Sequence, residues 1–294
     1  ITVSEFGSLV IMSVVYLVHK KRNRIKNLRI DRQDVSQITK QVFALAVPVA
    51  LGGFVMQLSQ VIDSVMVVNL LTVDNGTEMY GLWTGPVNSM LGLPIALSSG
   101  VAVSALPDIT KSYVSGDKER LARSFNSAIK LTLVIALPCA FGMIALSAPI
   151  LKLLYSGLPE HEIYVSSVLL SLSGLSIVFL ALLGTCVSVC QAVGKPYSSV
   201  VIVALAIVVK AVVNLVLLPK PEVNIYGAAI SETLCYLFAA SCVIIYLNKS
   251  VGLRVDGYTC VVKPLAAGML MTLVLTVAIG FAKDVFSGTL GTLV

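Results

Sequence analysis

The sequence predicts an all-α fold, a polytopic bundle of transmembrane helices. Of its 294 residues, 57% are hydrophobic and only 12% are charged, and the mean hydropathy is +0.93. A soluble domain carries about a quarter charged residues and roughly 45–50% apolar ones. This composition excludes disordered, coiled-coil, collagen-like and disulfide-scaffold proteins, and it argues strongly against a soluble globular enzyme.

Long apolar runs set the expected helices. A bilayer core of about 30 Å is crossed by about 20 apolar residues in a helix, and these runs are long and do not alternate as strands would. In chain order, the predicted spans are residues 3–18, 42–71, 83–107, 124–155, 163–193, 198–218, 226–247 and 258–282. A further apolar stretch starts at 286, so we expect a piece of a longer protein, cut within a helix at each end.

Basic residues fix the expected orientation, because cytoplasmic loops are enriched in Lys and Arg. With residues 19–40 in the cytoplasm, most of the 21 basic residues lie inside. The opposite loops carry Asp74, Glu78, Glu160 and Glu162. We expect the basic run to anchor the chain at a bacterial plasma membrane and to contact anionic lipids, rather than to bind nucleic acid.

The residue types that usually carry catalysis or metal binding are sparse. The six cysteines lie in or beside apolar spans without a CxxC pair, and only two histidines are present. Cys186 and Cys190 are one helical turn apart, which suits packing between helices. No phosphate loop, nucleophile elbow or pair of catalytic carboxylates is found, so we expect no metal, no cofactor and no enzyme activity.

Three ionisable residues lie at membrane depth, where they are costly and usually functional. From the helix rise of 1.5 Å, Asp63, Lys210 and Glu232 lie ~12, ~13 and ~9 Å from the outer surface. Asn214 is one turn beyond Lys210 on the same face. We expect Asp63 to pair with Lys210 beside Asn214, because an unpaired charge there would cost several kcal/mol. The pair either joins two helices or couples transport to an ion.

Glu232 has two alternatives. It can extend towards the outer interface, or it can share the cavity of the pair. If it is buried without a cation, its charged form is disfavoured, and it can then carry a proton.

Prolines inside three predicted helices indicate bends. Pro48, Pro94 and Pro138 each remove a backbone hydrogen bond and have a glycine within about one turn. Bent helices suit a lobe that opens and closes around a cavity, although packing explains them almost as well.

Ordered motifs over nearly the whole chain resemble those of one transporter family. They are Leu51-Gly52-Gly53 with Gln60-Val61-Ile62-Asp63, Leu93-Pro94, Ala105-Leu106-Pro107-Asp108, Gly116-Asp117-Lys118-Glu119-Arg120, Gln191-Ala192-Val193-Gly194-Lys195-Pro196, Val209-Lys210-Ala211-Val212-Val213-Asn214 and Asn224-Ile225-Tyr226-Gly227. The chain is similar to polysaccharide-biosynthesis flippases of the stage V sporulation protein B and lipid II flippase type. These belong to the multidrug/oligosaccharidyl-lipid/polysaccharide (MOP) exporter superfamily.

The resemblance implies a two-lobed flippase in which this chain supplies the second lobe. Residues 1–18 then end the last helix of the first lobe, and 19–40 form the cytoplasmic linker between lobes. Residues 41–248 form a six-helix C-terminal lobe, and 257–294 an added helix pair whose second helix is truncated. The missing first lobe is then a partner of this chain.

Two departures from the family pattern are visible. The segment 82–107 lacks a cavity-facing arginine that some lipid II flippases have, so most cations for the substrate diphosphate would come from the first lobe. Lys210 places an amine where some members bind sodium, beside the matching residues Asp63 and Asn214. A fixed amine in place of the ion favours proton coupling, potential-driven cycling or no coupling ion.

The resemblance implies a flippase for an undecaprenyl-linked glycan precursor, either lipid II or a polysaccharide or spore-wall repeat unit, working by alternating access. A MATE-like multidrug or cation antiporter is the alternative. It would need a cavity rich in carboxylates and aromatics, and the sequence offers only Trp83 and few inward acids. A membrane glycosyltransferase would need larger outer loops, and a purely structural subunit is the fourth interpretation.

Overall fold

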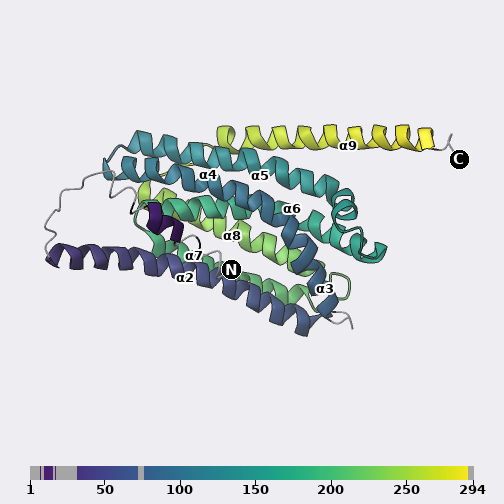
Figure 1. The fold of residues 1–294 in the computed structure, drawn as a ribbon, viewed down its shortest axis with the longest axis horizontal. Helices are drawn as coiled ribbons and strands as arrows, with labels where there is room; N and C mark the ends of the chain where they lie inside the picture. The colour runs from purple at the N-terminus through teal and green to yellow at the C-terminus, as the bar shows by residue number, and fades with distance from the viewer. Residues whose placement is uncertain (1–6, 8–9, 16, 18–31, 72–75, 291–294) are drawn as a thin grey trace. The chain divides into compact units, whose positions relative to one another are not determined.

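Every regular element of the computed structural model is a helix in the part that it describes, namely residues 7, 10–15, 17, 32–71 and 76–290 (Figure 1). The chain forms two compact units, Ile1–Ala44 and Leu45–Val294. The second unit contains all the sites discussed below. The predicted all-α class is confirmed.

The helices cover the predicted spans, and several extend beyond them. The elements are α2 (Arg32–Leu70), α3 (Gly76–Leu82), the π-helix η1 (Trp83–Val87), α4 (Asn88–Val114), α5 (Lys118–Leu154), α6 (Glu160–Ala192), α7 (Pro196–Leu217), α8 (Tyr226–Val251), the π-helix η2 (Tyr258–Val262) and α9 (Lys263–Leu290). Within the described ranges, seven helical segments are long and apolar enough to cross a membrane. They match the predicted spans from 42–71 to 258–282. Half of the predicted span 3–18 and residues 19–31 of the basic linker 19–40 lie outside the described residues.

Local sequence explains where several helices begin and end. The Asp117 side chain caps α5 by accepting a hydrogen bond of 2.9 Å from the Arg120 backbone N–H. Pro196 occupies the first turn of α7, where its missing N–H costs nothing. Gly252 ends α8 with a φ of +78°, a left-handed conformation that glycine adopts without strain.

The second span is longer than the predicted 83–107 and contains a π-turn. α3, η1 and α4 form one continuous candidate span over Gly76–Val114. Pro86 lies within η1, where the regular α-helical hydrogen bonding is already interrupted. Residues beyond 107 stay helical despite their charges, because a membrane helix can extend into water past its apolar part.

The three predicted bend prolines lie inside helices. Pro48 is in α2, Pro94 in α4 and Pro138 in α5. Bending at these positions in transport stays a prediction.

α7 shows the surface expected in a membrane. Val203, Ile207 and Lys210 lie on its buried face, three or four residues apart. Its opposite face exposes Val201, Leu205, Val208 and Val212. An exposed apolar stripe on a long helix suits contact with lipid rather than with water.

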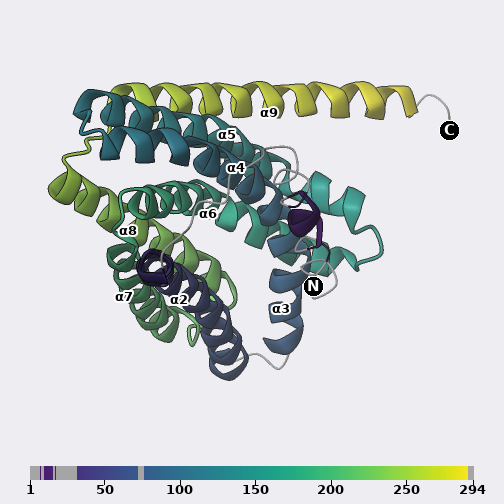
Figure 2. The same cartoon turned by 60° about the vertical axis from the view of Figure 1, so that its left-hand side comes forward.

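α6 lies at the centre of the second unit and contacts α4, α5, α7 and α8 (Figure 2). Its fully buried residues include Leu169, Ile177, Cys186 and Cys190, so both cysteines pack in the core as the sequence predicts. The hydroxyl oxygens of Thr132 and Thr185 are 2.8 Å apart and join α5 to α6. Small and hydroxyl residues let membrane helices approach closely.

Two glycines of α6 give a matched test of this packing. A Cβ at Gly174 would collide with Ile144 and lie 3.3 Å from the Ala140 carbonyl oxygen, whereas a Cβ at Gly184 meets nothing within 4 Å. We expect Gly174→Ala to lower the free energy of unfolding by about 1–3 kcal/mol through overpacking. Gly184→Ala should be neutral or stabilising by up to ~1 kcal/mol, because alanine is the better helix former. Denaturation in detergent checks this, and equal effects at the two positions would contradict it.

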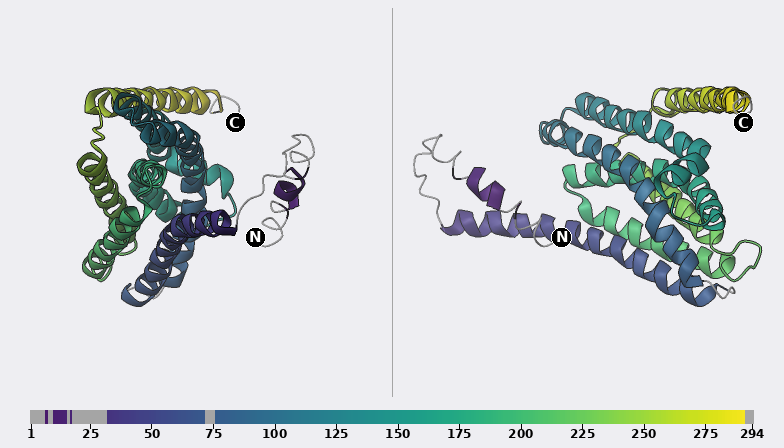
Figure 3. Two further views of the ribbon diagram at one scale, coloured as in Figure 1. Left: turned by 90° about the vertical axis from the view of Figure 1, so that its left-hand side faces the viewer. Right: turned by 45° about the vertical axis from the view of Figure 1, so that its right-hand side comes forward.

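α9 lies beside α5 (Figure 3). The approach is close at Gly268, where a Cβ would lie 2.7 Å from a ring carbon of Phe141. Asn126 of α5 fixes the connection into α9, since its side chain bonds the Arg254 carbonyl at 3.0 Å and the Asp256 N–H at 2.9 Å.

The structure differs from the sequence prediction near the end of α9. α9 continues as one helix to Leu290, where a break between 282 and 286 was expected. Lys283 and Asp284 interrupt the apolar run but not the helix, because neither residue breaks helical hydrogen bonding.

Candidate functional site

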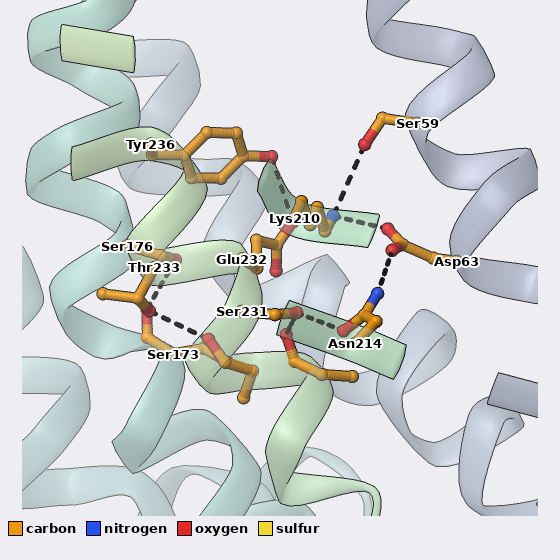
Figure 4. Close-up of polar contacts among 12 residues, drawn as sticks. Ser59, Asp63, Ser173, Ser176, Lys210, Asn214, Ser231, Glu232, Thr233 and Tyr236 are labelled. Carbon is orange, nitrogen blue, oxygen red and sulfur yellow. Dashed lines mark hydrogen bonds and ion pairs between the residues drawn. The ribbon is translucent and has the colours of Figure 1, made fainter. Parts of the chain in front are cut away.

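A buried ion cluster joins α2, α7 and α8 (Figure 4). The Lys210 Nζ lies 2.5 Å from the Asp63 Oδ2, and the Asn214 Nδ2 donates to the Asp63 Oδ1 at 3.1 Å. Only 3% of Lys210 and none of Asn214 is exposed. The predicted contact of Asp63 with Lys210 and Asn214 is therefore present, while its role in transport stays a prediction.

Glu232 belongs to the same cluster. Its Oε1 lies 3.9 Å from the Lys210 Nζ and accepts a hydrogen bond of 3.0 Å from the Tyr236 hydroxyl. Its Oε2 is buried without a hydrogen-bond partner among the described residues. The structure supports the alternative in which Glu232 shares the cavity of the Asp63–Lys210 pair. The proton-carrier hypothesis requires burial without a nearby cation, whereas the Lys210 ammonium lies 3.9 Å from Glu232.

Helical spacing explains why these side chains meet. Asp63 and Ser59, Lys210 and Asn214, and Glu232 and Tyr236 are pairs four residues apart, so each pair lies on one face of its helix. The Ser59 hydroxyl is 3.5 Å from the Lys210 Nζ, and the Ser231 hydroxyl donates to the Asn214 Oδ1. Sequence reasoning missed Ser59, Ser231 and Tyr236. The four-residue spacing from Asp63 and Glu232 could have found Ser59 and Tyr236.

The cluster contains two carboxylates and one ammonium group. Lys210 can balance only one of Asp63 and Glu232, so with all three ionised the cluster carries one net negative charge. A buried charge without a partner is strongly unfavourable. The arrangement can therefore take up one proton or one monovalent cation, and Lys210 can exchange between the two carboxylates.

The two carboxylates face a polar cavity of about 420 Å³. Every helix from α2 to α4 contributes to it, and so do α6 and α8. Its lining residues are Gln60, Asp63, Tyr80, Trp83, Thr84, Asn88, Leu91, Gly92, Ile95, Ser176, Leu180, Glu232 and Tyr236. The cavity combines the two acids predicted at membrane depth with three aromatic residues, of which the sequence singled out Trp83 alone. The apolar runs of the sequence predict how deep a residue lies in the membrane, but they do not predict which polar residues of different helices line the same cavity.

A second cavity, of about 230 Å³, lies between α2, α6 and α7 and is largely apolar. Leu180 lines both cavities and so lies between them. Pro48 borders the apolar cavity, whereas Pro94 and Pro138 border neither.

A family model decides the identity of the chain. The model described as lipid II flippase MurJ matches residues 6–294. The chain belongs to the MurJ family. The predicted recognition is therefore confirmed, and the chain is a multi-pass membrane protein of the MOP superfamily.

Individual MurJ relatives are distant in sequence. The lipid II flippase MurJ of Bacillus subtilis (strain 168) is 22% identical over 299 residues, an alignment that covers 98% of this chain and 53% of that protein. The chain thus spans about half the length of this relative.

Solved structures show the same fold. A lipid II flippase MurJ in an inward closed conformation matches with a TM-score of 0.64 and 20% identity, covering 86% of this chain and 51% of its own. A MATE protein crystallised with MaD5 matches with a TM-score of 0.63 and 16% identity, covering 84% and 57%. At these identities the likeness concerns the fold alone, which MurJ and MATE proteins share.

Proposed function

We propose that this chain forms part of a flippase that moves an undecaprenyl-linked glycan precursor across a bacterial plasma membrane by alternating access. The precursor is lipid II or a related polysaccharide or spore-wall repeat unit. Membership of the MurJ family supports the transport class. The observation that carries the proposal is the buried ion cluster facing a polar cavity between membrane-spanning helices. On this proposal the protein is a transporter and not an enzyme.

In this proposal, Asp63, Lys210, Asn214 and Glu232 form the coupling site. Uptake of a proton or a monovalent cation neutralises the excess negative charge. Protonation of Asp63 would weaken its contact with Lys210, the shortest of the polar contacts between α2 and α7, which also include Asn214–Asp63 and Lys210–Ser59. Lys210 then turns to Glu232, and α2 is freed to move relative to α7 and α8.

The substrate diphosphate needs cations that this cavity does not offer. Among the described residues, none of those lining the polar cavity is Lys or Arg. We propose that the diphosphate binds cations of a first lobe, whose last helix would end with residues 1–18. Residues 41–248 would then be the second lobe and 257–294 an addition to it.

We propose that the linker 19–40 is cytoplasmic and contacts anionic lipids. The turn between α4 and α5 would then face the cytoplasm, and the turn between α5 and α6 the outside. Ser115 and Ser156 are exposed in these two turns and allow the same substitution. In a background without the native cysteines, we expect a membrane-impermeant maleimide to label Ser156→Cys in intact cells and Ser115→Cys only after lysis. The reverse pattern would contradict this orientation.

One observation favours a second candidate, the MATE-like antiporter. Asp63 and Glu232 share their cavity with Tyr80, Trp83 and Tyr236, and aromatic faces with carboxylates attract organic cations. Lys210 argues against the antiporter, because its ammonium group already neutralises one of the two carboxylates that an organic cation would need.

The experiment that separates the two candidates uses the full reading frame that contains these 294 residues. It is expressed in bacteria depleted of their own lipid II flippase, and the outward appearance of labelled lipid-linked precursor is followed. Export of ethidium is measured in parallel. Outward precursor without ethidium export supports the flippase. Ethidium export without precursor movement would favour the antiporter. If a well-expressed protein shows neither activity, another polyprenyl-linked glycan becomes the candidate substrate.

A further inference from the structure

We propose that the polar cavity binds the sugar part of the lipid-linked glycan, and not its diphosphate or its lipid chain. This inference rests on the proposed flippase function and assigns one segment of the substrate to one site. It is carried by the free polar groups of the cavity, by its aromatic walls and by its charge.

Two amide side chains in the cavity are free to bind a ligand. Gln60 of α2 and Asn88 of α4 are both exposed and line the cavity. Neither amide group has a hydrogen-bond partner among the described residues. Each amide offers donors and an acceptor side by side, which matches sugar hydroxyls that both donate and accept.

The carboxylates add stronger acceptors. The buried Glu232 Oε2 is without a partner among the described residues, while Oε1 is held by Tyr236. Hydrogen bonds to an ionised acceptor are roughly twice as strong as those between neutral groups. A hydroxyl or an acylated amino group of a sugar that reaches this oxygen would satisfy it.

Three aromatic side chains give the cavity walls that suit a sugar ring. Tyr80 and Tyr236 are half-buried and keep part of their surface open, whereas Trp83 of η1 is only 5% exposed and offers little ring surface to a ligand. A sugar ring is polar at its rim and carries C–H bonds on its faces, which pack well on the electron-rich face of an aromatic ring. A volume of about 420 Å³ falls within the roughly 300–1,000 Å³ of small-molecule sites.

The charge of the cavity disfavours the other parts of the substrate. A diphosphate would face two carboxylates, while the Lys210 ammonium is directed at Asp63 and its side chain is only 4% exposed. Like charges that face each other at an interface cost several kcal/mol. A polyprenyl chain would cover the amides and carboxylates, now open to the cavity, without offering them hydrogen-bond partners, and covering polar groups in this way costs free energy.

An organic cation is the competing occupant. It would use the aromatic rings and one carboxylate but not Gln60, Asn88 and Thr84. These neutral groups favour a ligand that is rich in hydroxyls and amides.

The test compares two lipids that differ only in their sugars. The protein of the full reading frame is purified, and its affinity is measured for undecaprenyl diphosphate and for the same lipid carrying its sugars. Gln60→Leu and Asn88→Leu remove one free amide each. Gln191→Leu is the matched control, because Gln191 lines the apolar cavity.

We expect each cavity variant to bind the glycosylated lipid about three- to tenfold more weakly, as the loss of a hydrogen bond predicts. Binding of undecaprenyl diphosphate should be unchanged, and the control should bind both lipids as the wild type does. Unfolding temperatures of all variants are compared, so that misfolding is recognised.

Three results would overturn the inference. Equal losses for both lipids would assign the cavity to the diphosphate or to a structural role. No loss for either lipid would remove the sugar from this site. Binding of tetraphenylphosphonium, an organic cation, is measured on the same variants, and a loss of this binding alone would assign the cavity to a cation. A wild-type protein that does not bind the glycosylated lipid would instead contradict the flippase function itself.

Discussion

Replacing Lys210 by methionine is expected to destabilise the folded protein by about 3–5 kcal/mol. The substitution keeps the length of the side chain but removes the cation that lies 2.5 Å from Asp63 and 3.9 Å from Glu232. Two buried carboxylates then face each other without a counter-charge. Chemical or thermal unfolding of the purified protein measures the loss.

An exposed lysine of the same kind provides the control. Lys152 lies 3.7 Å from Glu160, and both side chains are largely exposed. Ion pairs of this type contribute about 0–1 kcal/mol, so Lys152→Met should have little effect. If Lys210→Met and Lys152→Met reduce stability equally, the buried cluster does not have the electrostatic role assigned to it.

Glu232→Gln is expected to slow transport by about tenfold or more, a barrier change of ~1.4 kcal/mol, and to abolish its dependence on pH. The glutamine keeps the acceptor for Tyr236 but removes the second carboxylate, so the excess negative charge disappears. The groups around it are Asp63 on α2, Lys210 on α7, and Cys235 and Tyr236 on α8. The remaining pair of Lys210 and Asp63 then has no net charge, so that uptake of a proton is no longer needed to neutralise the cluster.

The conservative variant Glu232→Asp keeps a titratable group and should keep a pH-dependent rate. Precursor movement is measured in cells or vesicles at mildly acid and mildly alkaline pH. A rate that is independent of pH in wild type and Glu232→Gln alike would rule out Glu232 as a proton carrier.

The depth of the buried pair could be predicted from the sequence because a helix rises by a fixed amount per residue. Asp63 and Lys210 have similar distances to the ends of their apolar runs, and a lone charge in lipid is costly. These two facts are enough to predict that the two side chains meet. Asn214 is predicted to join them because it lies one helical turn after Lys210 on the same face of the helix.

The rest of the cluster depends on how each helix is rotated. Serine is common in apolar helices, so the four-residue spacing that marks Ser59 does not by itself establish a contact, and nothing in the sequence distinguishes Ser231 from serines that bond only to their own backbone. Glu232 lies near the start of α8, so its side chain could either extend towards the outer interface or stay buried. Packing of α8 against α6 decides between them.

The polar cavity could not be predicted for a similar reason. Trp83 and Asn88 reach it through the π-turn and the start of α4, elements that periodicity does not reveal. The unbroken α9 could not be predicted from hydropathy, because Lys283 and Asp284 interrupt the apolar run although the helix continues through both.

The most direct measurement is precursor flipping by a variant in which the cluster carries no charge. Asp63→Asn, Lys210→Met and Glu232→Gln are combined in the full reading frame, so that no buried charge is left without a partner and the protein can fold. The variant is expressed in bacteria depleted of their own lipid II flippase, with wild type beside it. If the cluster couples transport, the wild type restores outward movement of the labelled precursor, while the folded, membrane-inserted variant does not. Equal flipping by both would show that the cluster only joins helices, and would contradict its role in transport.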